Sequence, residues 1–217
     1  MKKLFSILAI AGACMASQAH VSDTRPMWGV KAAFDINIPG SWHGDAGSVE
    51  MYRQGYGGTV GIIYNVYLGR NFYLEPGVSL FYDKYSYKDL TISNIDGKDI
   101  NDPSLYKAGI RIPLVVGYQI PFSGAFAMNV FTGPEFNYAF AGAVNVKDKG
   151  AIDGTDISLF GENGHQHRAD LAWRVGFGLP YGNWCVTVEG AFGVTDLLKT
   201  GMSFRENRVS VGLSYYF

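Results

Sequence analysis

After its first twenty residues this 217-residue chain has no long hydrophobic run, so it lacks the stretch of about 20 apolar residues that a transmembrane helix needs. Its mean hydropathy of +0.03 is also too low for a bundle of membrane helices. Two cysteines are too few for a disulfide-rich fold. The 18 basic and 19 acidic residues nearly cancel, so nothing favours a nucleic-acid partner.

The N-terminus carries the pattern of an export signal. Two lysines precede a mostly apolar stretch from Leu4 to Ala13, and the segment Ser17-Gln18-Ala19 supplies small residues for a signal peptidase. This order is typical of a cleaved secretory signal. We therefore predict a signal peptide at residues 1–19 and a mature protein that begins at His20.

Two other fates of the N-terminus stay open, an uncleaved membrane anchor and lipidation at Cys14. The apolar stretch is short for an anchor, and Ala11 stands where a lipoprotein signal usually has leucine. Cleavage after residue 19 leaves 198 residues with 16 basic and 19 acidic side chains. Cys185 is then the single cysteine, so the mature chain forms no internal disulfide.

The end of the chain shows the pattern that best indicates the fold. From Asn207 to Phe217 apolar or aromatic residues alternate with polar or small ones, and a period of two predicts a β-strand. A terminal strand with one uncharged apolar face and one polar face is typical of the closing strand of a membrane-spanning β-barrel. The apolar face carries Val209, Val211, Leu213, Tyr215 and Phe217.

The same alternation recurs along the mature chain and predicts eight strands and no helix. Short turns and long polar loops follow one another alternately, which is typical of an outer-membrane barrel with both termini in the periplasm. We therefore predict an all-β fold for residues 20–217: an eight-stranded antiparallel up-and-down transmembrane β-barrel with short periplasmic turns and long extracellular loops. The expected strands span 27–38, 55–68, 72–87, 105–120, 125–141, 167–179, 184–196 and 205–217; the turns are 69–71, 121–124 and 180–183; the loops are 39–54, 88–104, 142–166 and 197–204.

One face of each expected strand is free of charge, as contact with lipid requires, because Arg or Lys at mid-membrane costs about 2–4 kcal/mol. The opposite face carries four basic and four acidic residues together with many glycines. Side chains roughly fill an eight-stranded barrel, and buried charges persist only when they are paired. We therefore predict a lumenal charge network that plugs the barrel, made of Lys31, Asp35, Glu75, Arg111, Glu135, Arg174, Glu189 and Arg208.

A soluble eight-stranded barrel that holds an apolar ligand is the main structural alternative. Aromatic residues near the expected strand ends favour the membrane, because aromatic girdles form at both membrane–water interfaces. The export signal and the terminal phenylalanine indicate the same compartment. The expected girdle consists of Trp28, Tyr64, Tyr67, Phe72, Tyr82, Tyr118, Phe126, Tyr138, Phe140, Trp184, Tyr215 and Phe217.

Three segments of the chain resemble the PorT-like outer-membrane β-barrel domain family. They read GIRIPL at 109–114, DLAWRVGFG at 170–178 and RVSVGLSYYF at 208–217, and the resemblance covers nearly the whole mature chain. The Ile-Pro-Leu step recurs in that family, whereas alternation of glycine with aromatic residues is common to all such barrels. The resemblance implies an eight-stranded outer-membrane barrel, in a family whose members mostly have no assigned activity.

The sequence offers little for metal or cofactor chemistry. His165 and His167, with His43 in another loop, form the only histidine grouping that could ligate a metal. They have no companion cysteine or regularly spaced carboxylate, so we expect a solvated loop. The acidic stretch 96–102 lacks the ligand spacing of a calcium loop. We therefore expect neither a metal nor a cofactor.

Two further function classes stay open as alternatives. Ser41, His43 and Glu50 share one loop and are the residue types of a lipid-modifying hydrolase, but no strand presents a fixed Ser–His pair. A narrow passive channel is the other, because the inner face is rich in glycine. The inward charges favour a closed lumen, and we expect no enzymatic activity.

The expected role is therefore structural or interactive. Its expected partners are outer-membrane lipid and lipopolysaccharide, the barrel-assembly machinery, which would read Phe217 as its signal, and a surface or periplasmic protein. The accessible groups of the long loops are Trp42, Tyr52, Lys147, Lys149, His165 and His167.

Overall fold

A computed structural model of the protein describes residues 27–44, 47–49, 53–86, 104–123, 126–146, 155–160, 166–198 and 204–217. Among these residues there is no helix long and apolar enough to cross a membrane. Several of the predictions concern residues outside these ranges: the signal peptide at 1–19 with Cys14, the start at His20, the stretch 96–102, and the loop residues Glu50, Tyr52, Lys147, Lys149 and His165.

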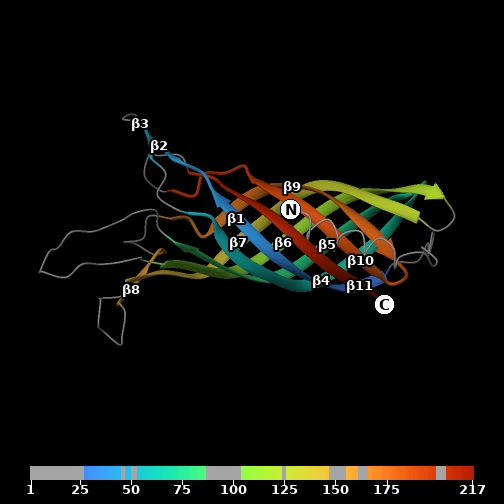
Figure 1. Cartoon of the computed structure of the whole chain (residues 1–217), viewed down its shortest axis with the longest axis horizontal. Helices are drawn as coiled ribbons and strands as arrows, with labels where there is room; N and C mark the ends of the chain where they lie inside the picture. The colour runs from blue at the N-terminus through green and yellow to red at the C-terminus, as the bar shows by residue number, and fades with distance from the viewer. Residues whose placement is uncertain are drawn as a thin grey trace, which may run out of the picture.

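Eight long strands form a closed antiparallel barrel, which confirms the predicted fold (Figure 1). Each strand pairs with its neighbours in the chain, and the barrel closes where the first strand pairs with the last, from Gly29 opposite Tyr216 to Pro39 opposite Glu206. The strands are β1 (Met27–Pro39), β4 (Gly55–Gly69), β5 (Phe72–Ser86), β6 (Ser104–Ser123), β7 (Phe126–Val146), β9 (Ala169–Tyr181), β10 (Trp184–Gly193) and β11 (Glu206–Tyr216).

Three short strands lie in segments that the sequence predicts to be loops. β2 (Trp42–Gly44) and β3 (Gly47–Val49) form a small hairpin of their own, and β8 (Thr155–Ser158) pairs with the end of β7. The prediction that β7 ends at residue 141 was therefore wrong, because the strand continues to Val146 and gains β8 as a partner. All three short strands lie at one end of the barrel (Figure 1).

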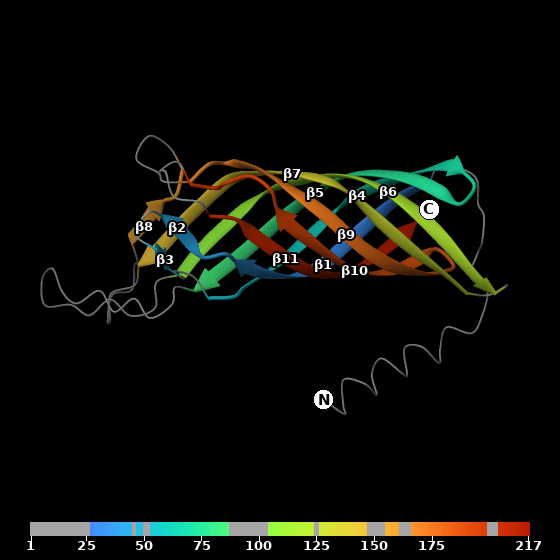
Figure 2. The ribbon, with the colours of Figure 1, turned by 90° about the horizontal axis from the view of Figure 1, so that it is seen from above.

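The two ends of the barrel differ in their connections (Figure 2). At the end that we call the turn end, β4 and β5 are joined by Arg70 and Asn71, whose φ angles are 52° and 68°. Two successive positive φ angles are typical of the type I′ turn, whose twist matches that of a hairpin. Gly182 and Asn183 join β9 to β10 at the same end. The opposite end, with β2, β3 and β8, is the loop end.

The outer wall is apolar, as the alternation predicts. On β1, for example, Trp28, Val30 and Phe34 are exposed while Lys31 and Asp35 are buried. Within the described strands the outer rows carry one charged residue, Lys84, near the loop end of β5. This position corrects the expectation of outer rows without any charge. A charge near the end of a strand still reaches the polar membrane interface.

Aromatic pairs lie on the outer wall near both ends of the barrel. Tyr67, which the sequence places in this girdle, instead lines the interior at the turn end. The pairs near the turn end are Trp28–Tyr64, Phe72–Tyr118 and Trp184–Tyr215, with ring centroids 4.6, 4.7 and 4.7 Å apart; those near the loop end are Phe34–Tyr56 at 6.1 Å and Tyr82–Tyr106 at 6.4 Å.

Candidate functional site in the barrel interior

The barrel interior holds a continuous series of ion pairs in which acids and bases alternate. It begins at Lys31 on β1 and ends at Asp83 on β5, and all eight of its side chains are buried. We call it the ion-pair chain. Its links are Lys31–Glu189 at 2.7 Å, Glu189–Arg174 at 2.8 Å, Arg174–Glu135 at 3.2 Å, Glu135–Arg208 at 2.7 Å, Arg208–Asp35 at 3.9 Å, Asp35–Arg111 at 2.6 Å and Arg111–Asp83 at 2.6 Å.

Hydroxyl groups complete the coordination of Asp35, near the middle of the ion-pair chain. Thr59 on β4 donates a hydrogen bond to Asp35 and accepts one from Arg111. Ser210 donates to the other carboxylate oxygen of Asp35 at 2.5 Å and accepts from Arg208 at 3.2 Å. With Thr59 included, all eight long strands contribute to this cluster. Pairing and hydrogen bonding of this kind allow charges to stay buried.

The structure brings together seven of the eight predicted network residues and leaves Glu75 apart. Glu75 accepts hydrogen bonds from the Tyr216 hydroxyl at 2.7 Å and from the Asn65 carboxamide at 3.3 Å, nearer the turn end. Asp83, which the sequence analysis missed, takes the last position in the ion-pair chain. Asp83 and Glu75 are both odd-numbered residues of β5, so the alternation of that strand was the signal that could have found it.

An apolar layer covers the ion-pair chain at the loop end. Loop residues pack there against the ends of β5 and β6, and we call these residues the mouth cluster. The backbone holds the loops in place, because His167 donates to the Leu197 carbonyl at 2.8 Å and Leu197 donates to the Phe204 carbonyl at 2.9 Å. The mouth cluster consists of Tyr85, Leu105, Leu197, Leu198 and Phe204, each at most 6% exposed.

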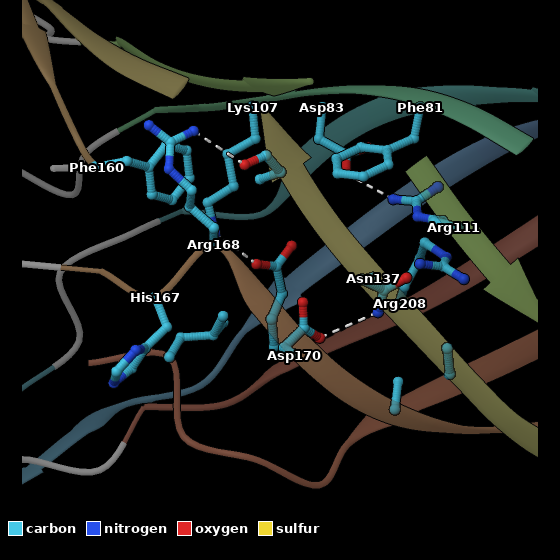
Figure 3. A pocket seen from close by; sticks show the side chains of 15 residues that line it. Phe81, Asp83, Lys107, Arg111, Asn137, Phe160, His167, Arg168, Asp170 and Arg208 are labelled. Atoms are coloured by element: carbon cyan, nitrogen blue, oxygen red, sulfur yellow. Dashed lines mark hydrogen bonds and ion pairs between the residues drawn. The ribbon is translucent and has the colours of Figure 1, made fainter. Parts of the chain in front are cut away.

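Between the mouth cluster and the ion-pair chain lies a cavity of about 40 Å³ (Figure 3). A water molecule needs at least about 10–15 Å³ by this measure, so the cavity has room for a few waters and not for a larger ligand. Lys107 pairs with Glu206 at 2.9 Å beside it, and Tyr85 donates a hydrogen bond to the same carboxylate. Arg168 stacks on the ring of Phe160, 4.9 Å from its centroid. Charged and aromatic side chains thus fill much of the loop end.

A larger cavity of about 240 Å³ lies at the other end of the interior, and we call it the turn-end cavity. On β6 it is lined by Gln119, whereas Arg111 of the ion-pair chain lies eight residues away toward the loop end. No lysine, arginine, histidine or acidic side chain is among its lining residues in the described part of the chain. The lining of this cavity is therefore uncharged, and the nearest charged group is Glu75, which is hydrogen-bonded to the lining residues Tyr216 and Asn65.

The described part of the structure does not include the complete predicted grouping of His43, His165 and His167. His167 is exposed at the loop end, the backbone of His43 lies in β2, and His165 falls outside the described residues. Among the described residues, no group of three or more His, Cys, Asp or Glu side chains is placed to hold a metal ion. Cys185 is a buried free thiol at the turn-end cavity.

The sequence match covers nearly the same residues as the barrel. Residues 5–217 match the outer membrane protein beta-barrel domain family. The chain belongs to this family. Membership implies an outer-membrane location in a Gram-negative envelope, and in such barrels the short turns face the periplasm and the long loops face outward. By this rule we assign the turn end to the periplasm and the loop end to the cell exterior, an assignment that the labelling experiment below tests. No curated protein matches the chain.

Several solved outer-membrane barrels are similar to this member of the family in overall fold. The identities of 11 to 14% are low, so the likeness concerns the fold and not the function. They include Neisserial surface protein A (14% identity, 88% of this chain and 97% of that chain covered, TM-score 0.45), OprG from Pseudomonas aeruginosa (12%, 88% and 95%, 0.46) and Ail of Yersinia pestis in complex with the heparin analogue sucrose octasulfate (11%, 89% and 99%, 0.45).

Proposed function

We propose that this protein is a closed outer-membrane barrel that acts at the cell surface through its extracellular segments, with a plugged and ion-paired interior. The observation that carries the proposal is the occupied lumen: a chain of eight paired charges with the mouth cluster above it. Eight strands leave an interior that side chains roughly fill. The proposal disfavours a pore, since an ion would have to displace paired buried charges.

Planar-bilayer recording separates this role from a narrow channel. We expect no unit conductance from the wild-type barrel, and none from the double variant Leu197→Ala, Phe204→Ala, because the ion-pair chain still fills the lumen below the opened mouth. Arg111→Met in the same background removes the side chain that joins Asp35 to Asp83 and is the variant most apt to conduct. Unit conductance from the wild type would contradict the proposal.

The orientation of the loops is tested with two matched cysteine variants. His167→Cys places a thiol at the exposed loop end, and Asn183→Cys places one at the exposed turn end. Cys185 is buried and gives a low background. A membrane-impermeant maleimide applied to intact cells is expected to label the first variant and not the second. Labelling of Asn183→Cys alone would reverse the proposed orientation.

Contact with lipopolysaccharide is the interaction that we propose for the loops at 39–54, 88–104 and 142–166, whose cationic groups include Lys147 and Lys149. Binding of purified lipopolysaccharide to the barrel in nanodiscs is expected to weaken in the double variant Lys147→Ala, Lys149→Ala. Lys84→Ala is the matched control, because Lys84 lies on the outer wall. Equal weakening by both would show general charge attraction only, and would count against loop recognition.

A lipid-modifying activity is the alternative that the residues Ser41 and His43 left open. Expression of the protein in a host with defined lipid A, followed by mass spectrometry of that lipid, tests it directly. We expect unaltered lipid A. A mass change that is abolished by His43→Ala would replace the proposed role with an enzymatic one.

We also propose that residues 1–19 are a cleaved signal, that the chain is PorT-like, and that Phe217 is read by the assembly machinery. The Phe217 side chain is 71% exposed, while its backbone amide donates to the Trp28 carbonyl at 2.8 Å. Phe217→Ala therefore keeps the backbone bond. We expect it to lower the amount of assembled barrel in cells and to leave unfolding in detergent unchanged; equal amounts in cells would contradict the signal role.

A further inference from the structure

The turn-end cavity is an uncharged polar chamber at the periplasmic mouth of the barrel. It measures about 240 Å³, which is below the about 300–1,000 Å³ of typical small-molecule sites and suits one small unit of a ligand. Its lining is dominated by carboxamides and tyrosines. The carboxamides are Asn65, Asn71, Gln119, Asn129 and Asn183, and the tyrosines are Tyr67, Tyr73 and Tyr216.

Register and glycine positions create this chamber. Gln119 on β6 lies directly opposite Asn129 on β7, and Asn129 in turn lies opposite Gly178 on β9. A Cβ atom at Gly178 would approach the Cys185 Sγ to 2.9 Å, so this glycine makes room for the buried thiol at the cavity wall. Gly117 has the same effect for Tyr73, because a Cβ atom at Gly117 would collide with the tyrosine ring. Most of the chamber wall is therefore built from strand positions, which are more rigid than a loop, and the turn residues Asn71 and Asn183 complete it.

Several wall groups are already held in place by neighbours. Glu75 accepts from both the Tyr216 hydroxyl and the Asn65 carboxamide, and the Asn183 carboxamide donates to the Tyr216 carbonyl at 2.8 Å. The carboxamide oxygen of Asn129, by contrast, is buried without a hydrogen-bond partner. This oxygen therefore has capacity to accept a hydrogen bond from a ligand, as do several other buried polar atoms of the interior.

We propose that the turn-end cavity binds a small uncharged saccharide unit presented from the periplasm. Each sugar hydroxyl is both a donor and an acceptor, and carboxamides and phenols offer both in return. The rings of Tyr67, Tyr73 and Tyr216 at the same cavity add aromatic surface for the apolar face of a sugar ring. An anionic ligand would find no counter-charge among the lining side chains.

A peptide fits this chamber less well. Extended peptides are usually captured by adding a strand to a free sheet edge. The barrel closes β1 against β11, so its eight-stranded wall offers no such edge. Recognition has to come from side chains, and their chemistry is matched by hydroxyl and acetamide groups. This site is separate from the extracellular segments to which we assign the proposed function. A failure of either proposal leaves the other unaffected.

Calorimetric titration of the mature barrel with N,N′-diacetylchitobiose tests the proposal, in a detergent without a sugar headgroup. We expect saturable binding that Gln119→Leu and Asn129→Leu each weaken about tenfold, the effect of losing roughly one hydrogen bond. Asn37→Leu is the matched control, because Asn37 is a buried inward carboxamide near the loop end and is expected to leave binding unchanged. Heat-modifiable migration on gels verifies that each variant is folded, and Tyr67→Phe replaces any variant that is not.

Three results would overturn the proposal. They are absence of binding by the wild type, binding that the cavity variants leave unchanged, and binding of dialanine as tight as that of the saccharide. Glucosamine 6-phosphate is expected to bind at least about tenfold more weakly than the neutral disaccharide, and equal binding would show that the missing counter-charge does not select the ligand.

Discussion

The two halves of the barrel interior accommodate inward-facing polar side chains in different ways. In the middle and the extracellular half, charged side chains fill the lumen and neutralise one another, as in the pairs of Arg208 with Glu135 and of Arg111 with Asp83. In the periplasmic half, neutral carboxamides and tyrosines line an open chamber. Paired buried charges are costly to separate, whereas neutral polar groups exchange partners readily. The two halves thus contrast a lumen closed by paired charges with a cavity lined by neutral polar groups.

The largest expected effect is at Glu135, which is fully buried and joins Arg174 to Arg208. Glu135→Gln removes the carboxylate that the two guanidinium groups share and leaves the buried ion-pair chain with one uncompensated positive charge, although Arg174 keeps Glu189 and Arg208 keeps Asp35. We expect it to lower the free energy of unfolding by about 3–5 kcal/mol. Urea titration of the barrel folded in phospholipid vesicles measures this value.

Arg111→Met tests whether the ion-pair chain acts as one network, because Arg111 belongs to the same chain as Glu135. Residues that share a network are expected to couple, so the double variant should lose less stability than the two single losses added together. If Glu135→Gln and Arg111→Met leave the unfolding midpoint unchanged, singly and together, the ion-pair chain is not structural.

The next largest effect is expected in the mouth cluster. Phe204→Ala removes a ring that is 2% exposed, and we expect a loss of about 3 kcal/mol, near the lower end for phenylalanine truncation, because loop residues can partly close the space. Faster exchange of the amides at residues 166–167 and 197–198, measured by hydrogen exchange, would accompany it. Unchanged exchange there would show that the cluster does not hold the loops.

Glu75 lies in the periplasmic half, and Glu75→Gln is the same chemical change there as Glu135→Gln in the ion-pair chain. The new amide oxygen still accepts from Tyr216, and no basic residue loses a counter-charge, so we expect a loss of about 1 kcal/mol. Urea titration under identical conditions compares the two variants. A loss as large as that of Glu135→Gln would remove the distinction between the two halves.

The smallest expected effect lies in the periplasmic turn. Arg70 has a φ angle of 52°, a conformation that asparagine tolerates better than arginine. We expect Arg70→Asn to raise the free energy of unfolding by about 0.5 kcal/mol. Asn71→Asp, at the neighbouring turn residue, is the control and should change stability less. A lower stability of Arg70→Asn would indicate that the arginine makes contacts in the membrane interface.

Most of the fold followed from local alternation. The strand that contains Lys31 and Asp35 alternates so regularly that its inner and outer rows were predictable residue by residue. Prediction failed where a strand's end or face was ambiguous. Tyr67 was placed in the outer girdle because aromatic residues are common there, although its odd number puts it on the row of Ile63 and Asn65, which faces inward.

The candidate sites were harder to predict than the rows that carry them. Asp83 and Glu75 are equivalent in the sequence pattern, yet Asp83 pairs with Arg111 and Glu75 with Tyr216. The difference depends on which residue of the neighbouring strand lies at the same level along the barrel axis. Strand stagger is set by barrel closure, and it does not appear in the alternation of any single strand.

By itself, the sequence determined that this chain forms a membrane-compatible barrel and which side chains face its interior, because a period of two is a local property of each strand. Tertiary structure alone decided that Lys31 and Asp83 lie at opposite ends of one ion-pair chain, that Leu197 and Phe204 cover it, and that Gln119 and Asn129 face an open chamber. These contacts join residues far apart in the chain, and only the closed, tilted arrangement of all eight strands brings them to the same height.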